Sequence, residues 1–509
     1  MFKGIVFRDE VEELVRFVEE TDPSEIIGRT LEKLRDGTAA VDLLRAGALA
    51  VCRSTELPPE HHGGPVHPIC GIHGVYNTSR RLSGEMAFMP IVQHVALCNN
   101  HVNSPQMGPY IMPAMEALEG TGAMIGSYHL ADGTEASDEP DVMGSTEEAL
   151  LKAIEVRKPS LAEQYYLWLE QNRTPGETLE LLLPASVSRN SIDDHYFVYP
   201  MFTFRALDVI GWEWAPVLMR VVVRYQARNP FSLTRTQESV FEDVTELIEK
   251  YALMEREIPV RTGERESGAI GKLGETIGRC TNYMDGMEPM ARALAEGLSL
   301  EGAGEALSVG ASMAYLKSSY GNPMDSHLHT GTNGRRYLLD LEGVSLRHKV
   351  EALITGLTGP ECINGSRMLW ETPFDASKTE ALPEMGQAEM LDAIVESIDG
   401  QPESNWREIG VDNLELGHEV QEAMLLAQRY ADRRYDPEAL FKRLGELICR
   451  DDFTELHGIK HHQALIDEFF ATREPYRWNH LVAAVKSVAV IEGGKERTIF
   501  DRTLDMLKV

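Results

Sequence analysis

The chain has 509 residues, of which 43% are apolar, so it is long enough to bury a large core and to form two or more structural units. Acidic residues outnumber basic ones by 80 to 49, and the resulting formal net charge of −31 makes nucleic acid and anionic membranes poor partners. Because no run of 18 uncharged apolar residues occurs and the N-terminus lacks a signal-peptide pattern, we expect a cytoplasmic protein with no membrane partner. Six scattered cysteines without a Cys-x-x-Cys motif give no support for an iron–sulfur cluster or a zinc ribbon.

Apolar residues recur at helical spacing through most of the chain, whereas strand-like alternation is rare and short. A first helix is predicted over residues 39–51, and a Pro/Gly-rich loop at 58–65 leads from it into a histidine-bearing helix. A polar connector is predicted at 131–140 and a further amphipathic helix at 238–251. The sequence therefore predicts an all-α protein.

A histidine pattern occurs twice, about 260 residues apart. His73 is followed by His195 in the first half, and His329 is followed by His457 in the second, so that equivalent histidines are 256 and 262 residues apart. This spacing predicts an internal duplication with the seam at the loop 261–268. We expect two similar helical halves, residues 1–265 and 266–509, packed around a shared central site.

Other polar residues follow the histidines at similar intervals in the two halves. His94 and His348 come 21 and 19 residues after His73 and His329, and Asn77 and Asn333 come one helical turn after them. A single histidine on a helix is more often a hydrogen-bonded core residue than a ligand, and that alternative applies to His94, His348 and His129. Residues that could contact the side chains of a metal site, or its substrate, are His94, His348, His461, Tyr199, Asn77 and Asn333.

Four histidines brought together between two halves would favour a metal site, because neutral imidazole is the commonest metal ligand. A divalent ion normally also needs an anionic ligand. Lys460 follows His457 by three residues and so shares its helix face, whereas the corresponding position in the first half is Val198. Burial beside a metal lowers the pKa of a lysine, and the neutral amine can then capture carbon dioxide as an anionic carbamate. The alternative for His457 and Lys460 is an exposed helix face.

The His-x-x-Lys element His457-Gly-Ile-Lys460, with widely separated histidines in a long all-α chain, resembles the questin-oxidase-like family of flavin-free oxygenases. The resemblance implies a mononuclear non-heme Fe(II) held by His73, His195, His329, His457 and a carboxylated Lys460. It also implies that dioxygen is used for Baeyer–Villiger-type insertion or for ring cleavage of polycyclic aromatic compounds. We therefore expect an iron-dependent oxygenase that acts on an apolar, cyclic small molecule.

Alternatives remain at the level of single residues and of the whole protein. His61, His62 and His67 lie close to His73 and compete with it for the role of ligand. The same ligands could bind zinc and activate water in a hydrolase, or the chain could be a helical scaffold whose acidic surface binds another protein.

Other cofactor-binding patterns have little support. Only Glu415-Leu-Gly-His418 fits half of a di-iron motif, and no His-Glu-x-x-His, Gly-x-Gly-x-x-Gly or phosphate-binding loop occurs, so flavin, NAD and nucleotide chemistry have no motif behind them.

Overall fold

A computed structural model shows that the protein is mostly α-helical, as the sequence predicts. It describes residues 3–56, 64–108, 110–125, 141–188, 195–228, 235–281, 285–322, 327–356, 368–404, 408, 414–452 and 454–507. The two predicted amphipathic segments are helices, α3 (Ala40–Ser54) and α11 (Arg235–Lys250). The predicted connector at 131–140 and most of the loop at 58–65 lie outside the described residues.

Ordinary helix signals account for where many helices begin. Ser145, Ser299 and Ser345 each accept a hydrogen bond from a backbone N–H in the first turn of the helix that follows. Asp436 does the same for a helix whose first residue is Pro437, a position where the missing N–H costs nothing. Local sequence thus marks where these four helices begin.

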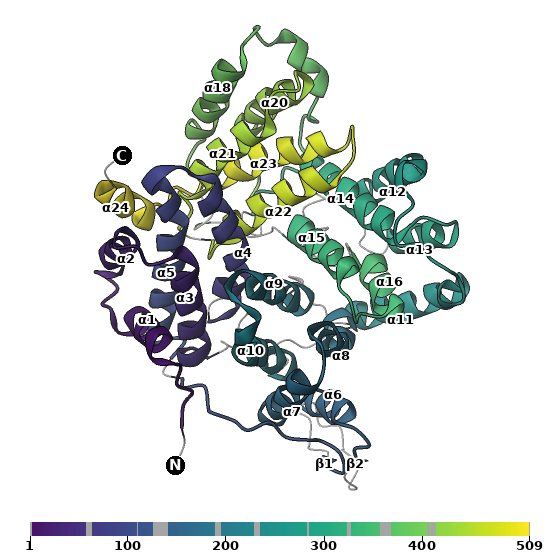
Figure 1. The fold of residues 1–509 in the computed structure, drawn as a ribbon. Helices are drawn as coiled ribbons and strands as arrows, with labels where there is room; N and C mark the ends of the chain where they lie inside the picture. The colour runs from purple at the N-terminus through teal and green to yellow at the C-terminus, as the bar shows by residue number, and fades with distance from the viewer. Residues whose placement is uncertain are drawn as a thin grey trace.

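The first half of the chain contributes two groups of helices, seen from purple to teal in Figure 1. The first group packs at the N-terminal end, and the second group follows a two-stranded antiparallel sheet, β1 (Met124–Ile125) and β2 (Asp141–Val142). The helices are α1 (Asp9–Glu20), α2 (Ile26–Arg35), α3, α4 (Val66–Arg81), α5 (Met89–Val102), α6 (Thr146–Glu155), α7 (Pro159–Asn172), α8 (Pro175–Ser188), α9 (His195–Ile210), α10 (Ala215–Arg228) and α11, with short 3₁₀ turns η1 (Gly84–Phe88), η2 (Trp212–Trp214) and η3 (Leu253–Glu255).

The second half, drawn from teal to yellow, also contributes two groups. Its helices are α12 (Ser267–Gly278), α13 (Met287–Ala295), α14 (Leu300–Lys317), α15 (His327–Asp340), α16 (Leu346–Ile354), α18 (Gln387–Asp399), α20 (Glu419–Asp432), α21 (Pro437–Ile448), α22 (His457–Ala471), α23 (Arg477–Glu492) and α24 (Thr498–Met506), with 3₁₀ turns η4 (Gly263–Glu266) and η5 (Ala376–Ala381).

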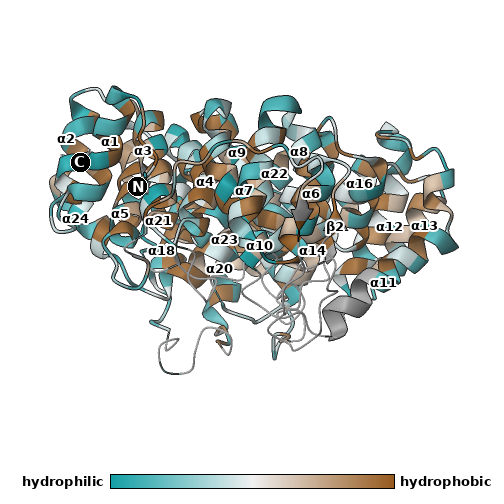
Figure 2. Cartoon of the chain, turned by 90° about the horizontal axis from the view of Figure 1, so that it is seen from below, coloured by the Kyte–Doolittle hydropathy of each residue, from teal (hydrophilic) through white to brown (hydrophobic). Residues whose placement is uncertain are grey.

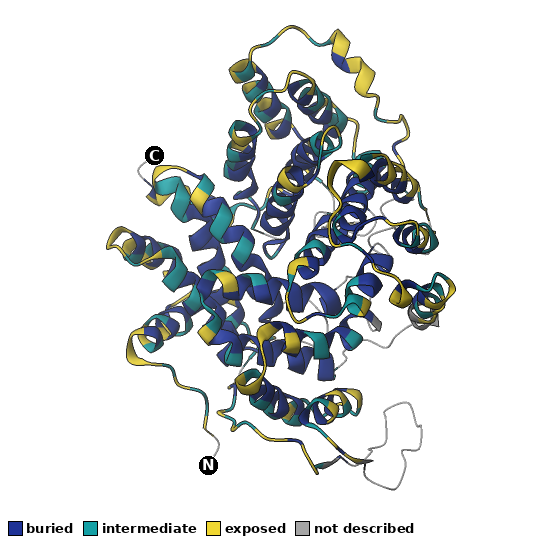
Figure 3. Cartoon of the chain, turned by 45° about the vertical axis from the view of Figure 1, so that its right-hand side comes forward, coloured by how far each residue is buried: buried dark blue, intermediate teal, exposed yellow. Residues whose placement is uncertain are grey.

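Four helices form a closed ring at the centre of the molecule. α4 contacts α9, α9 contacts α15, α15 contacts α22, and α22 contacts α4, so that each half of the chain provides two members (Figure 1). The same region is the most deeply buried part of the protein, and exposed residues lie toward the rim (Figure 3). From below, the molecule is broad and shallow, and apolar and polar residues alternate along its helices (Figure 2).

Burial on nearly all sides sets the central helices apart from the outer ones. α22 buries ten consecutive residues from its first position, whereas α1 buries mainly Val11, Val15 and Val18, the stripe of an ordinary amphipathic helix. A helix surrounded by others must satisfy every polar side chain that it carries. The histidines of α22 are therefore in positions where a polar group needs a specific partner.

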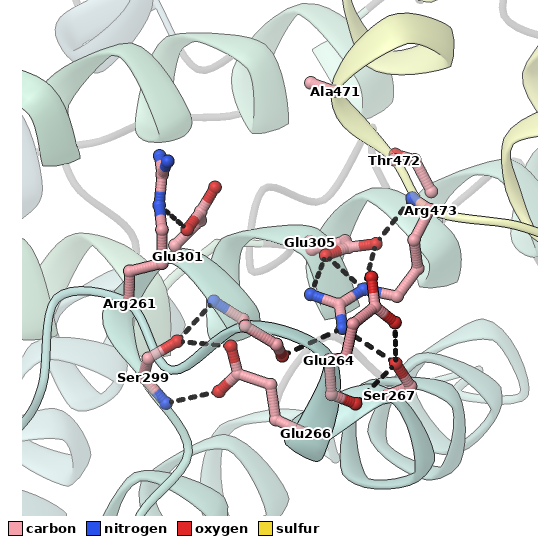
Figure 4. A network of polar contacts seen from close by, with 12 residues as sticks. Arg261, Glu264, Glu266, Ser267, Ser299, Glu301, Glu305, Ala471, Thr472 and Arg473 are labelled. Atoms are coloured by element: carbon pink, nitrogen blue, oxygen red, sulfur yellow. Dashed lines mark hydrogen bonds and ion pairs between the residues drawn. The ribbon is translucent and has the colours of Figure 1, made fainter.

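The predicted boundary between residues 265 and 266 falls in η4, where a buried polar network fixes the chain (Figure 4). Arg473, which follows α22, binds both carboxylate oxygens of Glu305 and donates to the Gly263 carbonyl and the Ser267 hydroxyl. Glu266 accepts hydrogen bonds from the backbone and hydroxyl of Ser299, which itself caps α14. These contacts attach the segment to α14 and to the end of α22. Among the described residues, no helix is long and apolar enough to cross a membrane.

Candidate metal centre

Four buried imidazoles meet where the four central helices begin. His67, His195, His327 and His457 each occupy the first or second position of α4, α9, α15 and α22, and none is more than 4% exposed. We call these four residues the histidine ring. The first turns of these four helices place each imidazole next to two others. The position of a histidine at a helix start is thus what brings it to the centre.

The ring is continuous from one imidazole to the next. Successive centroids lie 5.2 Å apart for His67–His195 and His195–His327, 5.7 Å for His327–His457 and 4.6 Å for His457–His67. The Nε2 atoms of His67 and His195 are 3.2 Å apart, and one nitrogen each from His67, His195 and His457 lies within 4.8 Å of the other two.

Two members of the ring have their tautomer fixed by an outer contact. Nδ1 of His457 lies 2.6 Å from the carbonyl oxygen of Thr454, and since a carbonyl only accepts, this nitrogen carries the proton. Nδ1 of His67 donates in the same way to the carboxylate of Glu455. In both residues the lone pair is therefore on Nε2. A ligand histidine whose other nitrogen donates to a carboxylate or a carbonyl is the usual arrangement at protein metal sites.

The surroundings keep His457 neutral. Burial holds the pKa of His457 well below its usual range, and the nearby Lys460, His67 and His327 lower it further. A neutral imidazole retains the lone pair that a metal ion requires. His457 therefore has a free lone pair on Nε2 with which it can bind a metal ion near pH 7.

The donor set and its spacing fit a transition-metal ion. Two imidazole nitrogens bound to one ion at about 2.0–2.1 Å, with angles between about 90° and 110°, lie roughly 2.9–3.4 Å apart. The 3.2 Å between the Nε2 atoms of His67 and His195 falls in this range. Neither cysteine nor carboxylate belongs to the three-residue group within the described part of the chain, and an all-imidazole set suits iron, copper, nickel or zinc.

The structure brings together only two of the four predicted histidine ligands, His195 and His457. His73 lies six residues beyond His67 on α4, outside the ring, where burial and the nearby Arg205 lower its pKa to about 3. His329 also lies outside the ring, with its Nδ1 2.8 Å from Nε2 of His461. Their places in the ring are taken by His67, which the sequence offers as a competitor of His73, and by His327, which sequence reasoning missed.

His329 and His461 belong to a second buried polar group next to the ring. Ser487 contacts the other nitrogen of His461 at 3.0 Å, and Tyr315 packs edge-on against both imidazoles. Burial is the first cause of the low pKa of each: that of His461 falls to about 3 and that of His329 lies well below its usual range. His461, predicted to contact the bound ligands or the substrate, is therefore paired with a histidine that was predicted as a ligand.

Lys460 is a core residue and not part of an exposed helix face, since it is only 5% exposed. It follows His457 by three residues on α22, and its charge lowers the pKa of His457 and opposes the rise that burial causes at the thiol of Cys70. The alternative of a surface position is thus wrong for both His457 and Lys460.

The remaining candidates have other roles in the described chain. His94 is a core residue whose Nε2 lies 3.0 Å from the Pro68 carbonyl, and His348 pairs with Glu180 near the surface. Asn77 donates to the His73 carbonyl, and Asn333 donates to Glu468. Tyr199 is fully buried one turn beyond His195, packs edge-on against Tyr225, and its hydroxyl has no hydrogen-bond partner among the described residues. His61, His62 and His129 lie outside the described residues.

A regular interval in the sequence could have identified His67 and His327. They are 260 residues apart, close to the 262 that separate His195 from His457, whereas His73 and His329 are 256 apart. Each is also followed by glycines at the fourth and seventh positions, Gly71 and Gly74 in α4 and Gly331 and Gly334 in α15. The motif His-x₃-Gly-x₂-Gly is therefore repeated. Its histidines, His67 and His327, lie six residues before His73 and two residues before His329.

Comparison of the chain with protein-family models, with curated proteins and with solved structures finds no match in any of the three. The resemblance to the questin-oxidase-like family therefore stays a prediction that rests on the residues quoted above.

Proposed function

We propose that the protein is a metal-dependent oxygenase that holds one non-heme Fe(II) in the histidine ring and acts with dioxygen on an apolar, cyclic small molecule. The observation that carries the proposal is the buried ring itself, with two of its members already held as Nε2 donors by Glu455 and Thr454. Several imidazoles grouped within contact distance in a core, with outer contacts that fix their tautomers, are the arrangement typical of a metal-binding site.

Iron would be held by His67, His195, His327 and His457, with Lys460, as a carbamate, the candidate for an anionic fifth ligand. When bound, Fe(II) supplies the redox reactivity toward dioxygen that organic side chains lack. The chain's own contribution is to orient the imidazoles, to keep them neutral by burial and to exclude bulk water from the centre. The substrate class follows from the family resemblance. The aromatic residues of α9, Tyr196, Phe197, Tyr199 and Phe202, are core residues.

We further propose that the two halves arose by duplication and that a pseudo-two-fold axis runs through the ring. Gly74 faces Ile459 across the α4–α22 contact, and Gly334 faces Phe197 across the α15–α9 contact. The two contacts are equivalent in the proposed duplication, because Gly74 and Gly334 are 260 residues apart and Phe197 and Ile459 are 262 residues apart. Arg205 and Asp467, 262 residues apart, form an ion pair at 3.2 Å, as expected of equivalent positions beside an axis.

Packing between whole helices supports the same correspondence. The contacts α1–α3, α2–α5, α7–α10 and α8–α9 in the first half have counterparts in α12–α14, α13–α16, α20–α23 and α21–α22. The last helix of each half also packs against the second helix of the other half: α11 contacts α13, and α24 contacts α2. A duplication makes the ring a site built from two copies of a two-histidine unit.

Metal analysis of the protein purified without added metal tests the proposal. Iron near one per chain supports the oxygenase, zinc would indicate the hydrolase, and no metal would indicate the scaffold. In the same experiment His67→Ala should lose most of the metal, whereas the matched control His73→Ala, on the same helix but outside the ring, should keep it. Equal metal content in His67→Ala and the wild type would contradict the ring as the site. Dioxygen uptake with a panel of polycyclic quinones then tests the substrate class.

A further inference from the structure

Glu455 contacts the histidine ring from outside and was not singled out by the sequence. Its carboxylate accepts the Nδ1–H of His67, and its other oxygen lies 3.8 Å from Nε2 of His101. His67 has no exposed surface, whereas the side chain of Glu455 is 26% exposed. The carboxylate thus lies between the buried ring and the surface.

The turn that carries Glu455 is held in an unusual conformation. Glu455 and Leu456 have φ angles of 50° and 70°, the left-handed region that non-glycine residues avoid, and they directly precede His457. Each such residue costs on the order of 1–3 kcal/mol and persists only when its surroundings fix it. The turn therefore needs anchors on both sides.

Contacts on both sides of the turn supply those anchors. Thr454 donates its backbone N–H and its hydroxyl to Asp451 and accepts from Gly458 and His457. Leu456 packs so closely on Gly71 of α4 that a Cβ there would lie 2.5 Å from Leu456 Cδ1. One short turn thus fixes His457 through a carbonyl and His67 through a carboxylate, and it joins α22 to α4.

We propose that Glu455 is a positioning residue of the metal centre, which fixes His67 as an Nε2 ligand and places a negative charge next to a ring made of neutral imidazoles. This inference rests on the proposed metal site. A carboxylate behind a ligand histidine makes the imidazole a stronger donor, and removing such a partner typically lowers metal affinity by about 10–100-fold. A histidine–carboxylate pair whose histidine does not belong to the ring has no such effect.

The test is calorimetric titration of the metal-free protein with CoCl₂ under nitrogen, together with thermal melting of each metal-free variant. Glu455→Gln should weaken Co²⁺ binding by about 10-fold and Glu455→Ala by up to about 100-fold. Glu455→Asp, which keeps the charge on a shorter side chain, should fall between Glu455→Gln and the wild type. The matched control is Glu180→Gln, which removes the carboxylate from the pair with His348, 2.8 Å apart and partly exposed. It should bind Co²⁺ like the wild type.

Each outcome decides between roles. Weaker Co²⁺ binding with an unchanged metal-free melting temperature supports a positioning role. Wild-type affinity in Glu455→Gln overturns it, and so does a loss of affinity matched by an equal loss of metal-free stability, which would make Glu455 a structural residue. Absence of Co²⁺ binding by the wild-type protein would instead overturn the metal centre itself, so that failure of the proposed function is recognised separately.

Discussion

Lys460 is the residue at which the two halves differ most in chemistry near the ring. Under the proposed duplication its equivalent in α9 is Val198, which is apolar and also buried. Lys460 itself is only 5% exposed. It also lies close enough to His457 to lower the pKa of that residue. The proposed duplication therefore places an ionisable residue in the second half where the first half has an apolar one.

We expect Lys460→Ala to reduce iron content, because it removes the candidate anionic ligand and leaves the charge of the ion less balanced. Lys460→Glu should restore part of the occupancy, since a carboxylate can replace a carbamate. Iron per chain in the purified variants is the measurement. Lys486→Met is a suitable control, because Lys486 is a second buried lysine, and it donates to the carbonyls of Tyr315 and Ser318, neither of which belongs to the ring. Wild-type iron content in Lys460→Ala would show that the lysine is not a ligand.

At the scale of single helices, the rotation of an α-helix decides which histidine of a pair enters the ring. Successive residues are rotated by about 100° around the helix axis. His329 is therefore separated from His327 by about 160° around α15, and His73 from His67 by about 120° around α4. Only one histidine of each pair can therefore face the centre. Helical spacing predicted the all-α fold and the helices α3 and α11, and the repeated histidine pattern predicted that His195 and His457 lie together. It could not choose between His67 and His73, because the direction of the core is set by neighbouring helices that are distant in the sequence.

Close approach of α4 and α22 is expected to depend on Gly74. A Cβ at this position would lie 3.1 Å from the Ile459 carbonyl oxygen, a backbone atom that cannot rotate away. Gly74→Ala should therefore push the two helices apart, cost about 1–3 kcal/mol in the free energy of unfolding and weaken metal binding by moving His67 relative to His457.

Gly334→Ala is the matched control for this prediction. A Cβ there would meet Met201 and Phe197 at 3.5–3.6 Å, which is ordinary van der Waals contact, and alanine is the better helix former. We expect unchanged or slightly higher stability, measured by urea unfolding of both variants. Equal stability of the two variants would show that the α4–α22 contact tolerates separation.

At the scale of the whole molecule, the protein buries an unusual number of neutral histidines inside an acidic surface. Burial is the main cause of a low pKa at each of them: about 3 for His461 and His462, and about 4 for His94 and His480. An unfolded histidine has a pKa of about 6.5. Between these values the unfolded chain binds protons that the folded chain does not, so each group contributes stability above about pH 6.5 that is lost as the pH falls.

The metal-free protein should therefore lose stability steeply between pH 7 and pH 5, by about 2 kcal/mol for each such histidine. Three carboxyl groups oppose this trend, because burial raises the pKa of Asp467 and Glu170 and raises that of Asp452 to about 7, so that the folded form keeps protons that the unfolded form releases. The buried histidines with a lowered pKa are more numerous. Urea unfolding in the presence of EDTA at pH 7, 6 and 5 measures the effect. His94→Gln removes one titrating group from a fully buried position outside the ring. It should lower the slope of the free energy of unfolding against pH by the equivalent of about one bound proton. A midpoint that does not move between pH 7 and pH 5 would mean that the buried histidines accept protons in the folded state, and it would contradict their role as neutral core residues and donors.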